Sequence, residues 1–159
     1  MRRLVVIAAL VLLLLAVAGV AASRFSLTAL EEPGQAETYL ATQAKRLFVA
    51  RDSRTGVPLE PASTPAGIAA GEKLFGAECA SCHGLNGRTP TDTGRWMYPR
   101  AADLSSEQAQ QYSDRELFWI LKNGIRLSGM PAFGRVETDG HIWQLVHYMR
   151  ALKQSAKQR

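Results

Sequence analysis

Three residues between positions 79 and 83 have types and spacing that allow a specific chemistry. Cys79, Cys82 and His83 form the pattern C-x-x-C-H, which is the signature of haem attachment. Two thiols three positions apart on one helical turn can each add to a haem vinyl group and form a thioether bond. His83 is then held under the iron as a neutral imidazole ligand. Because the chain contains only 2 cysteines, it can attach one haem at most.

A structural disulfide, a dithiol redox pair and half of a zinc site are the alternative interpretations of the two thiols. A zinc site would need a second Cys/His pair, and only His141 and His147 are left to supply it. We favour haem attachment, because features further along the chain support it.

The chain begins with Arg2 and Arg3, and an uninterrupted run of apolar and small residues follows at 4–22. At helical rise this run spans about 28 Å, close to the hydrocarbon thickness of a bilayer. The run is longer than the core of an ordinary signal peptide, so we favour an uncleaved single-pass membrane anchor over residues 1–22. The alternative is a signal peptide cleaved after Ala22, which would leave a soluble periplasmic protein. In both cases the basic end stays in the cytoplasm and the rest is exported.

Residues 23–63 form a connecting region. After the breaker Pro33-Gly34, residues 35–51 carry apolar side chains at three- and four-residue steps, which predicts a short amphipathic helix. This helix has three candidate contacts, namely its own domain, the membrane surface and a partner subunit, and we favour the first or the third. Prolines spaced through residues 57–65 then predict a linker.

Residues 64–159 are predicted to form one all-α domain. Thr64 with Pro65 begins a helix that runs towards Cys79. A capping box at residues 113–116 begins a second helix, and Asn123-Gly124 ends it. A last helix begins near residue 139, and its apolar face consists of Ile142, Leu145, Val146, Met149 and Leu152.

The net charge of +5 is spread over the whole chain. From residue 64 onwards there are twelve Lys and Arg against nine Asp and Glu, a surplus of three. This mildly basic surface does not resemble a nucleic-acid-binding footprint, so no nucleic-acid partner is expected.

Residues 64–153 resemble a class I c-type cytochrome with a single haem. The family carries a glycine, an aromatic residue four positions on and the first haem cysteine after four more, and Gly71, Phe75 and Cys79 match this pattern. Leu145 and Tyr148 match the leucine and aromatic residue of the C-terminal helix that crosses the glycine. The resemblance implies a cytochrome c fold, with three to five helices around one covalently bound haem c, preceded here by the transmembrane helix and the amphipathic helix.

The resemblance also implies that a methionine in a loop before the last helix is the sixth ligand. Met130 lies in such a loop, between two predicted helices and followed by Pro131. We therefore predict His83/Met130 ligation of the iron. Met97 is a weaker candidate, and Met149 belongs to the apolar face of the last helix. The remaining histidines, 141 and 147, fall on the flanks of that helix and are expected to be exposed.

The resemblance also implies further contacts with the haem. Arg100 is the best candidate for neutralising a haem propionate. Trp96 and Trp119 are expected either to hydrogen-bond a propionate or to pack on the porphyrin ring. A proline carbonyl often orients the proximal histidine in this family, and Pro90 and Pro99 are both candidates for it.

An iron with both axial positions filled by protein has no open site for a substrate. The sequence therefore predicts an electron carrier rather than an enzyme, with an oxidase, a reductase or a dehydrogenase as redox partner. The alternative is a haem subunit of an enzyme complex, or a small-ligand sensor, in which Met130 dissociates. The sequence contains no evident distal acid–base pair of the kind that peroxide chemistry needs.

Overall fold

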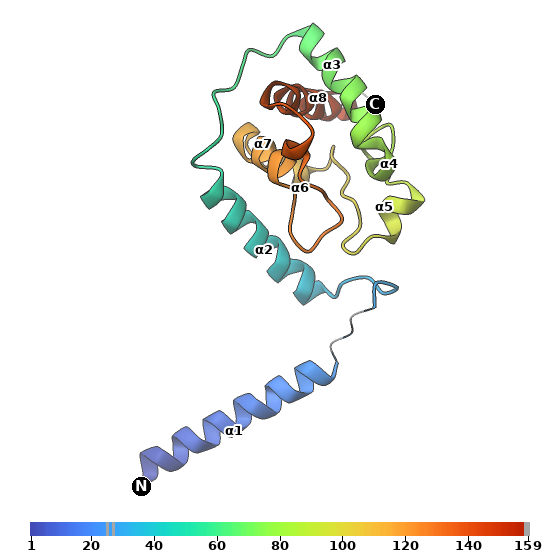
Figure 1. Ribbon diagram of the computed structural model, residues 1–159. Helices are drawn as coiled ribbons and strands as arrows, with labels where there is room; N and C mark the ends of the chain where they lie inside the picture. The colour runs from blue at the N-terminus through green and yellow to red at the C-terminus, as the bar shows by residue number, and fades with distance from the viewer. Residues whose placement is uncertain (25, 27, 158–159) are drawn as a thin grey trace.

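The computed structural model describes residues 1–24, 26 and 28–157, and every regular element among them is helical. The elements are α1 (Arg2–Ser23), α2 (Gln35–Asp52), α3 (Pro65–Glu78), α4 (Ala80–His83), α5 (Asp92–Trp96), α6 (Glu107–Gln110), α7 (Asp114–Asn123), η1 (Phe133–Arg135) and α8 (Asp139–Lys157). Three long helices, α3, α7 and α8, carry most of the core, and the shorter helices connect them (Figure 1). The all-α prediction is confirmed.

Helix α1 is apolar from Leu4 to Ala22, and none of its residues is buried. Its 22 residues correspond to about 33 Å at helical rise, enough to cross a bilayer. It projects away from the other helices in Figure 1. The helix predicted for the N-terminal run is therefore present and is long and apolar enough to span a membrane.

Helices α3 and α8 cross in close contact at Gly71. A Cβ atom at Gly71 would lie 2.1 Å from the carbonyl oxygen of Gln144, so the two backbones approach too closely for any side chain. One turn further on, the rings of Phe75 and Tyr148 pack with centroids 5.2 Å apart. Leu145 is 1% exposed beside them. The predicted crossing of these two helices is confirmed.

Replacing Gly71 by alanine is expected to force α3 and α8 apart and to lower the free energy of unfolding by about 1–3 kcal/mol, as overpacked cores do. The matched control is Gly76→Ala in the same helix, where an added Cβ has no neighbour within 4 Å. That control should be neutral or slightly stabilising. Guanidinium unfolding of the two holoproteins checks both values, and equal stability of the two variants would contradict the close crossing.

Helix α7 begins at the predicted capping box. The Ser113 hydroxyl accepts a hydrogen bond from the Glu116 amide, and the Glu116 carboxylate accepts one from the Ser113 amide. Phe118 of this helix is fully buried and stacks on Trp143 of α8, with ring centroids 4.5 Å apart. Met149 is 5% exposed and belongs to the core, as predicted.

The prediction that His147 is exposed is wrong. Its exposed fraction is 6%, and its Nε2 lies 3.2 Å from Oε1 of Glu60. Glu60 belongs to the segment between α2 and α3, which has no regular secondary structure and covers this flank of α8. His141 is exposed as expected, and its Nδ1 lies 2.6 Å from Oε2 of Glu137.

Helix α2 packs on its own domain, which is one of the two contacts that the sequence favoured. Val49 is 2% exposed and belongs to the domain core. Beside it, the Arg115 guanidinium of α7 donates hydrogen bonds to the carbonyl oxygens of Ser53 and Arg54, at 3.2 and 3.1 Å. Figure 1 shows α2 along one side of the domain.

Candidate functional site

The two cysteines lie where α3 passes into α4. Cys79 ends α3 and precedes α4, and its carbonyl oxygen accepts hydrogen bonds from the amides of Cys82 and His83, at 3.1 and 2.9 Å. Cys79 is buried and Cys82 is half-buried, and both thiols are free. The tight turn therefore carries both thiols and the imidazole, as the C-x-x-C-H spacing predicts.

Helix α5 packs against the backbone of this turn. The Thr91 hydroxyl donates a hydrogen bond to the Ser81 carbonyl at 2.6 Å, and the Thr91 amide donates one to the Cys82 carbonyl at 3.1 Å. A Cβ atom at Gly94 would lie 2.1 Å from that same Cys82 oxygen, so α5 makes direct backbone contact with α4. Gly84, with φ of +72°, turns the chain away directly after the histidine. The C-x-x-C-H turn is thus held by its contacts with α5 and by the sharp turn at Gly84.

His83 is oriented by a backbone carbonyl. Its Nδ1 lies 2.9 Å from the carbonyl oxygen of Ala102. A carbonyl oxygen only accepts, so Nδ1 carries the proton and Nε2 keeps its lone pair for a metal. Burial lowers the pKa of His83 and so favours the neutral imidazole, the form that ligates a metal.

The prediction that Pro90 or Pro99 supplies this carbonyl is wrong. The segment that contains Ala102 is held next to the histidine by two backbone hydrogen bonds. The Ala101 amide donates to the Gly94 carbonyl at 2.9 Å, and the Leu104 amide donates to the Gly87 carbonyl at 2.8 Å. These two bonds place the Ala102 carbonyl next to His83, and the contact does not depend on the side chain at position 102.

The thiol of Cys79 stays protonated at neutral pH in this environment. Burial, with smaller contributions from Glu78 and Cys82, raises the pKa of Cys79 to about 12. The protonated thiol is a poor metal ligand. Among the described residues, no group of three or more His, Cys, Asp and Glu side chains is gathered at one point. The zinc interpretation of these cysteines thus has no ligand set in the described part of the chain.

Met130 lies in a loop that closes on itself. The Ile125 amide donates a hydrogen bond to the Met130 carbonyl at 3.3 Å. The Ser128 hydroxyl accepts a hydrogen bond from the Met130 amide at 3.2 Å and donates one to the Ile125 carbonyl at 2.7 Å. At the base of the loop Gly124 has φ of +67°, and a Cβ there would lie 2.7 Å from the Met130 carbonyl oxygen. The Met130 side chain is half-buried and packs against the core. The loop therefore holds the methionine in a defined place.

Met97 lies closer to this loop than the sequence suggests. A Cβ atom at Gly129 would be 2.6 Å from the Met97 sulfur, so the two residues touch. The segment after α5 and the Met130 loop are thus neighbours, as Figure 1 also shows. A side chain at position 129 would push the Met97 side chain aside, a contact that the sequence alone could not indicate.

The predicted haem contacts occupy different surroundings. Trp96 is 76% exposed, whereas Trp119 is partly buried against the core. The Arg100 guanidinium lies 2.5 Å from the Glu32 carboxylate, and the neighbouring Tyr98 hydroxyl donates to Glu37 at 2.5 Å. Arg100 and Tyr98 therefore bind the segment at the start of α2, and the haem contacts of Arg100, Trp96 and Trp119 stay predictions.

The residues of the site fit a covalently held haem. Two thiols share one helical turn, and a half-buried neutral imidazole next to them keeps one nitrogen free. A methionine thioether is fixed in a separate loop. Thioether attachment with histidine and methionine as axial ligands uses this combination of side chains.

Comparison with known proteins agrees with this description. Residues 66–149 match the protein family described as cytochrome C oxidase, cbb3-type, subunit III. Two relatives named cytochrome c6, from Thermosynechococcus vestitus and Thermostichus vulcanus, are each 32% identical over 101 residues. The match covers 64% of this chain and 82% of each relative.

A solved structure has the same fold. It is a chain of the Kuenenia stuttgartiensis reducing HAO-like protein complex Kustc0457/Kustc0458, with a TM-score of 0.57 and 24% sequence identity. The similar region covers 62% of this chain and 49% of that one, about half of its length.

Proposed function

Since this chain belongs to the family of cytochrome c oxidase, cbb3-type, subunit III, and is a class I c-type cytochrome with covalently bound haem c, we propose that His83 and Met130 are its axial ligands. The protein is a haem electron-transfer protein, and the haem supplies a one-electron Fe(III)/Fe(II) couple. Cys79 and Cys82 attach the haem. With both axial positions filled, electrons pass without any substrate binding to the iron.

The hydrogen bond from His83 Nδ1 to the Ala102 carbonyl is the observation that carries this proposal. It restrains the imidazole ring and leaves Nε2 available at a half-buried position. The Met130 loop, closed by its own hydrogen bonds, supports the second ligand in the same way. Ligands restrained in this way would need little rearrangement when the iron changes its charge, which favours rapid electron transfer.

The surroundings of the remaining histidines argue against the alternative of an enzyme or a small-ligand sensor. His141 lies against Glu137 and His147 against Glu60, at 2.6 and 3.2 Å. Each imidazole thus already has a carboxylate partner on or beside α8. Both imidazoles are therefore held on the flanks of α8, whereas peroxide chemistry needs an acid–base pair over the open face of the iron.

We further propose that α1 is an uncleaved anchor, which leaves the haem domain on the periplasmic side of the cell membrane. The basic residues Arg2 and Arg3 begin α1, which supports a cytoplasmic N-terminus. The redox partners are then proteins of the same membrane or of the periplasm, namely an oxidase, a reductase or a dehydrogenase. The family description names an oxidase subunit, which supports an oxidase as the partner.

Replacing residues 1–22 by a cleavable signal should release a soluble, red cytochrome. It should contain one haem per chain by pyridine haemochrome assay and show the same single one-electron wave as the full-length protein in a potentiometric titration. This is expected because none of the residues of α1 is buried. Native protein found in the soluble fraction with Ser23 at its N-terminus would show that the helix is cleaved, and loss of the wave would contradict the assignment of electron transfer to the haem domain alone.

A further inference from the structure

Helix α2 presents its more apolar side to solvent. Leu40 and Leu47 are 66% and 67% exposed, and Phe48 beside them is 49% exposed. Residues 40 and 47 are two helical turns apart and share one face. We call Leu40, Leu47 and Phe48 the outer face of α2. A surface helix normally turns such a stripe towards the core, so this arrangement requires an explanation.

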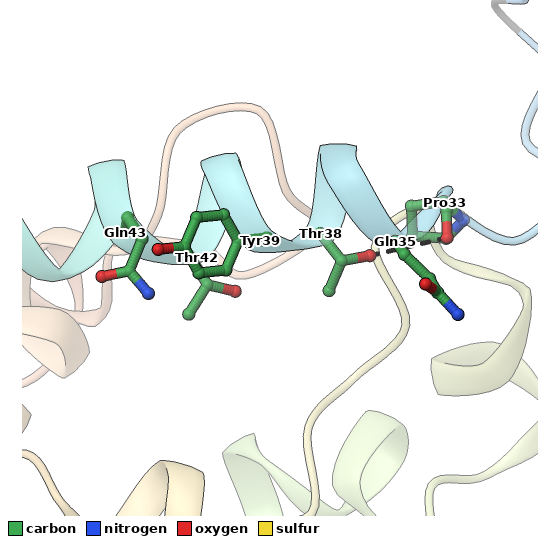
Figure 2. Close-up of a pocket in the computed structure, with 6 residues that line it drawn as sticks. All are labelled: Pro33, Gln35, Thr38, Tyr39, Thr42 and Gln43. Atoms are coloured by element: carbon green, nitrogen blue, oxygen red, sulfur yellow. Dashed lines mark hydrogen bonds between the residues drawn. The ribbon is translucent and has the colours of Figure 1, made fainter.

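The opposite side of α2, which faces the domain, is mostly polar. Val49 is its one buried apolar residue, and Thr42 and Thr38 precede Val49 by seven and eleven positions on the same face. Figure 2 shows Thr38 and Thr42 together with Gln35 on one side of the helix, where they line a shallow hollow. The helix therefore has an inward position that an apolar side chain could fill, because half-buried Thr42 occupies it.

Contacts along its length fix the orientation of α2. At its C-terminal end Arg115 holds the carbonyls of Ser53 and Arg54. In the middle, the Arg46 guanidinium donates to the Gln111 side chain at 2.6 Å. Near its start Tyr98 donates to Glu37. The helix cannot rotate its outer face inward without breaking these bonds, so the outer face is available for an external partner.

The position of α2 in the chain indicates which partner. Only residues 24–34 separate the end of α1 from the start of α2, and eleven residues reach about 40 Å at most. Once α1 spans the bilayer, α2 is confined to the membrane surface at a high effective concentration. A tethered surface of this kind needs little intrinsic affinity to stay bound.

The chemistry of the outer face suits a lipid interface. Leucine and phenylalanine side chains partition into the boundary between headgroups and acyl chains. The Arg51 guanidinium lies 4.9 Å from the centroid of the Phe48 ring, at the end of the stripe. A basic group beside an inserted aromatic ring can reach the phosphates while the ring is buried. Arg51 is exposed, and its Nε also pairs with the Asp52 carboxylate at 2.6 Å.

We propose that the outer face of α2 lies in the lipid headgroup region on the exported side of the membrane and thereby fixes the orientation of the haem domain. This inference rests on the proposed anchoring by α1. Because α2 is bonded to the domain through Arg115, Arg46 and Tyr98, docking the helix also sets the angle between the haem and the bilayer. The surface offered to a redox partner is then constant.

The test uses the full-length oxidised holoprotein in stacked, oriented bilayers of phosphatidylethanolamine and phosphatidylglycerol. The electron paramagnetic resonance spectrum of the ferric haem is recorded as a function of the angle between the membrane normal and the field. For the wild type we expect a spectrum that changes strongly with this angle. In the variant Leu40→Ser/Leu47→Ser the angle dependence should be lost, with unchanged haem content and membrane retention.

The matched control is Leu59→Ser/Val136→Ser, at sites that are 94% and 73% exposed away from α2, and it should keep the angle dependence. An isotropic wild-type spectrum, or an ordered spectrum from the outer-face variant, would overturn the inference. If the wild type formed a dimer in detergent and the outer-face variant did not, the partner of the outer face would be a second copy of the chain and not the membrane. Protein that washes off the bilayers would instead contradict the anchor. If the double variant lost haem, Leu47→Ser alone would provide the same comparison.

Discussion

Replacing Cys79 and Cys82 together by alanine is expected to abolish covalent haem and to leave the domain largely unfolded. Both thioether positions lie at the junction of α3 and α4, where Cys79 is 7% exposed within the core. A small domain that packs around a porphyrin loses much of its buried apolar surface without it. Ligand binding to the folded state also no longer contributes to stability.

A pyridine haemochrome assay on washed membranes measures the first effect, and immunoblotting of the same membranes measures the second. The control is Ser81→Ala, an exposed position between the two cysteines, which should keep a normal c-type signal and a normal amount of protein. A normal signal from the double cysteine variant would refute attachment at these residues.

Replacing Met130 by alanine is expected to keep the thioethers but to open the sixth coordination position. A thioether is a soft ligand that favours Fe(II), so its loss should lower the reduction potential by a substantial part of the roughly 0.8 V range that axial ligands control. The reduced variant should also bind carbon monoxide, because water or a weak ligand would take the place of the sulfur. Potentiometric titration and visible spectra measure both effects.

The other two methionines of the haem domain are the controls. Met97→Ala should keep the wild-type potential, although its sulfur touches Gly129. Met149→Ala should also keep it, at a cost of about 2–5 kcal/mol in stability as a core truncation. If Met130→Ala kept the wild-type potential and the double variant Met130→Ala/Met97→Ala did not, Met97 would be the ligand in Met130→Ala. If the double variant also kept the wild-type potential, another residue would hold the iron.

The parts of the fold that the sequence predicted well are those with local or strongly patterned signals. The capping box at Ser113 and the Thr64-Pro65 pair mark helix starts through short-range hydrogen bonds and steric preference. The crossing of α3 and α8 was predictable because Gly71, Phe75 and Tyr148 are residue types that a close helix contact requires. The C-x-x-C-H pattern likewise carries its chemistry within five positions.

The features that could not be predicted depend on groups or contacts without a sequence signature. Every residue has a carbonyl, so nothing marks Ala102 as the partner of His83, and the prolines at 90 and 99 were misleading. The burial of His147 depends on the segment around Glu60, far away in the chain and without regular structure. The side of α2 that packs on the domain was equally undetermined, since Val49 lies inside while Leu40 and Leu47 lie outside.

If His83 and Met130 fill both axial positions of the iron, the protein transfers electrons without binding a substrate. The most direct test is to add carbon monoxide to the reduced wild-type holoprotein and to record its visible spectrum. We predict no change over the time in which the Met130→Ala variant is fully converted. Ready formation of a carbon monoxide complex by the wild type would show an open or easily opened sixth position and would contradict the proposed function.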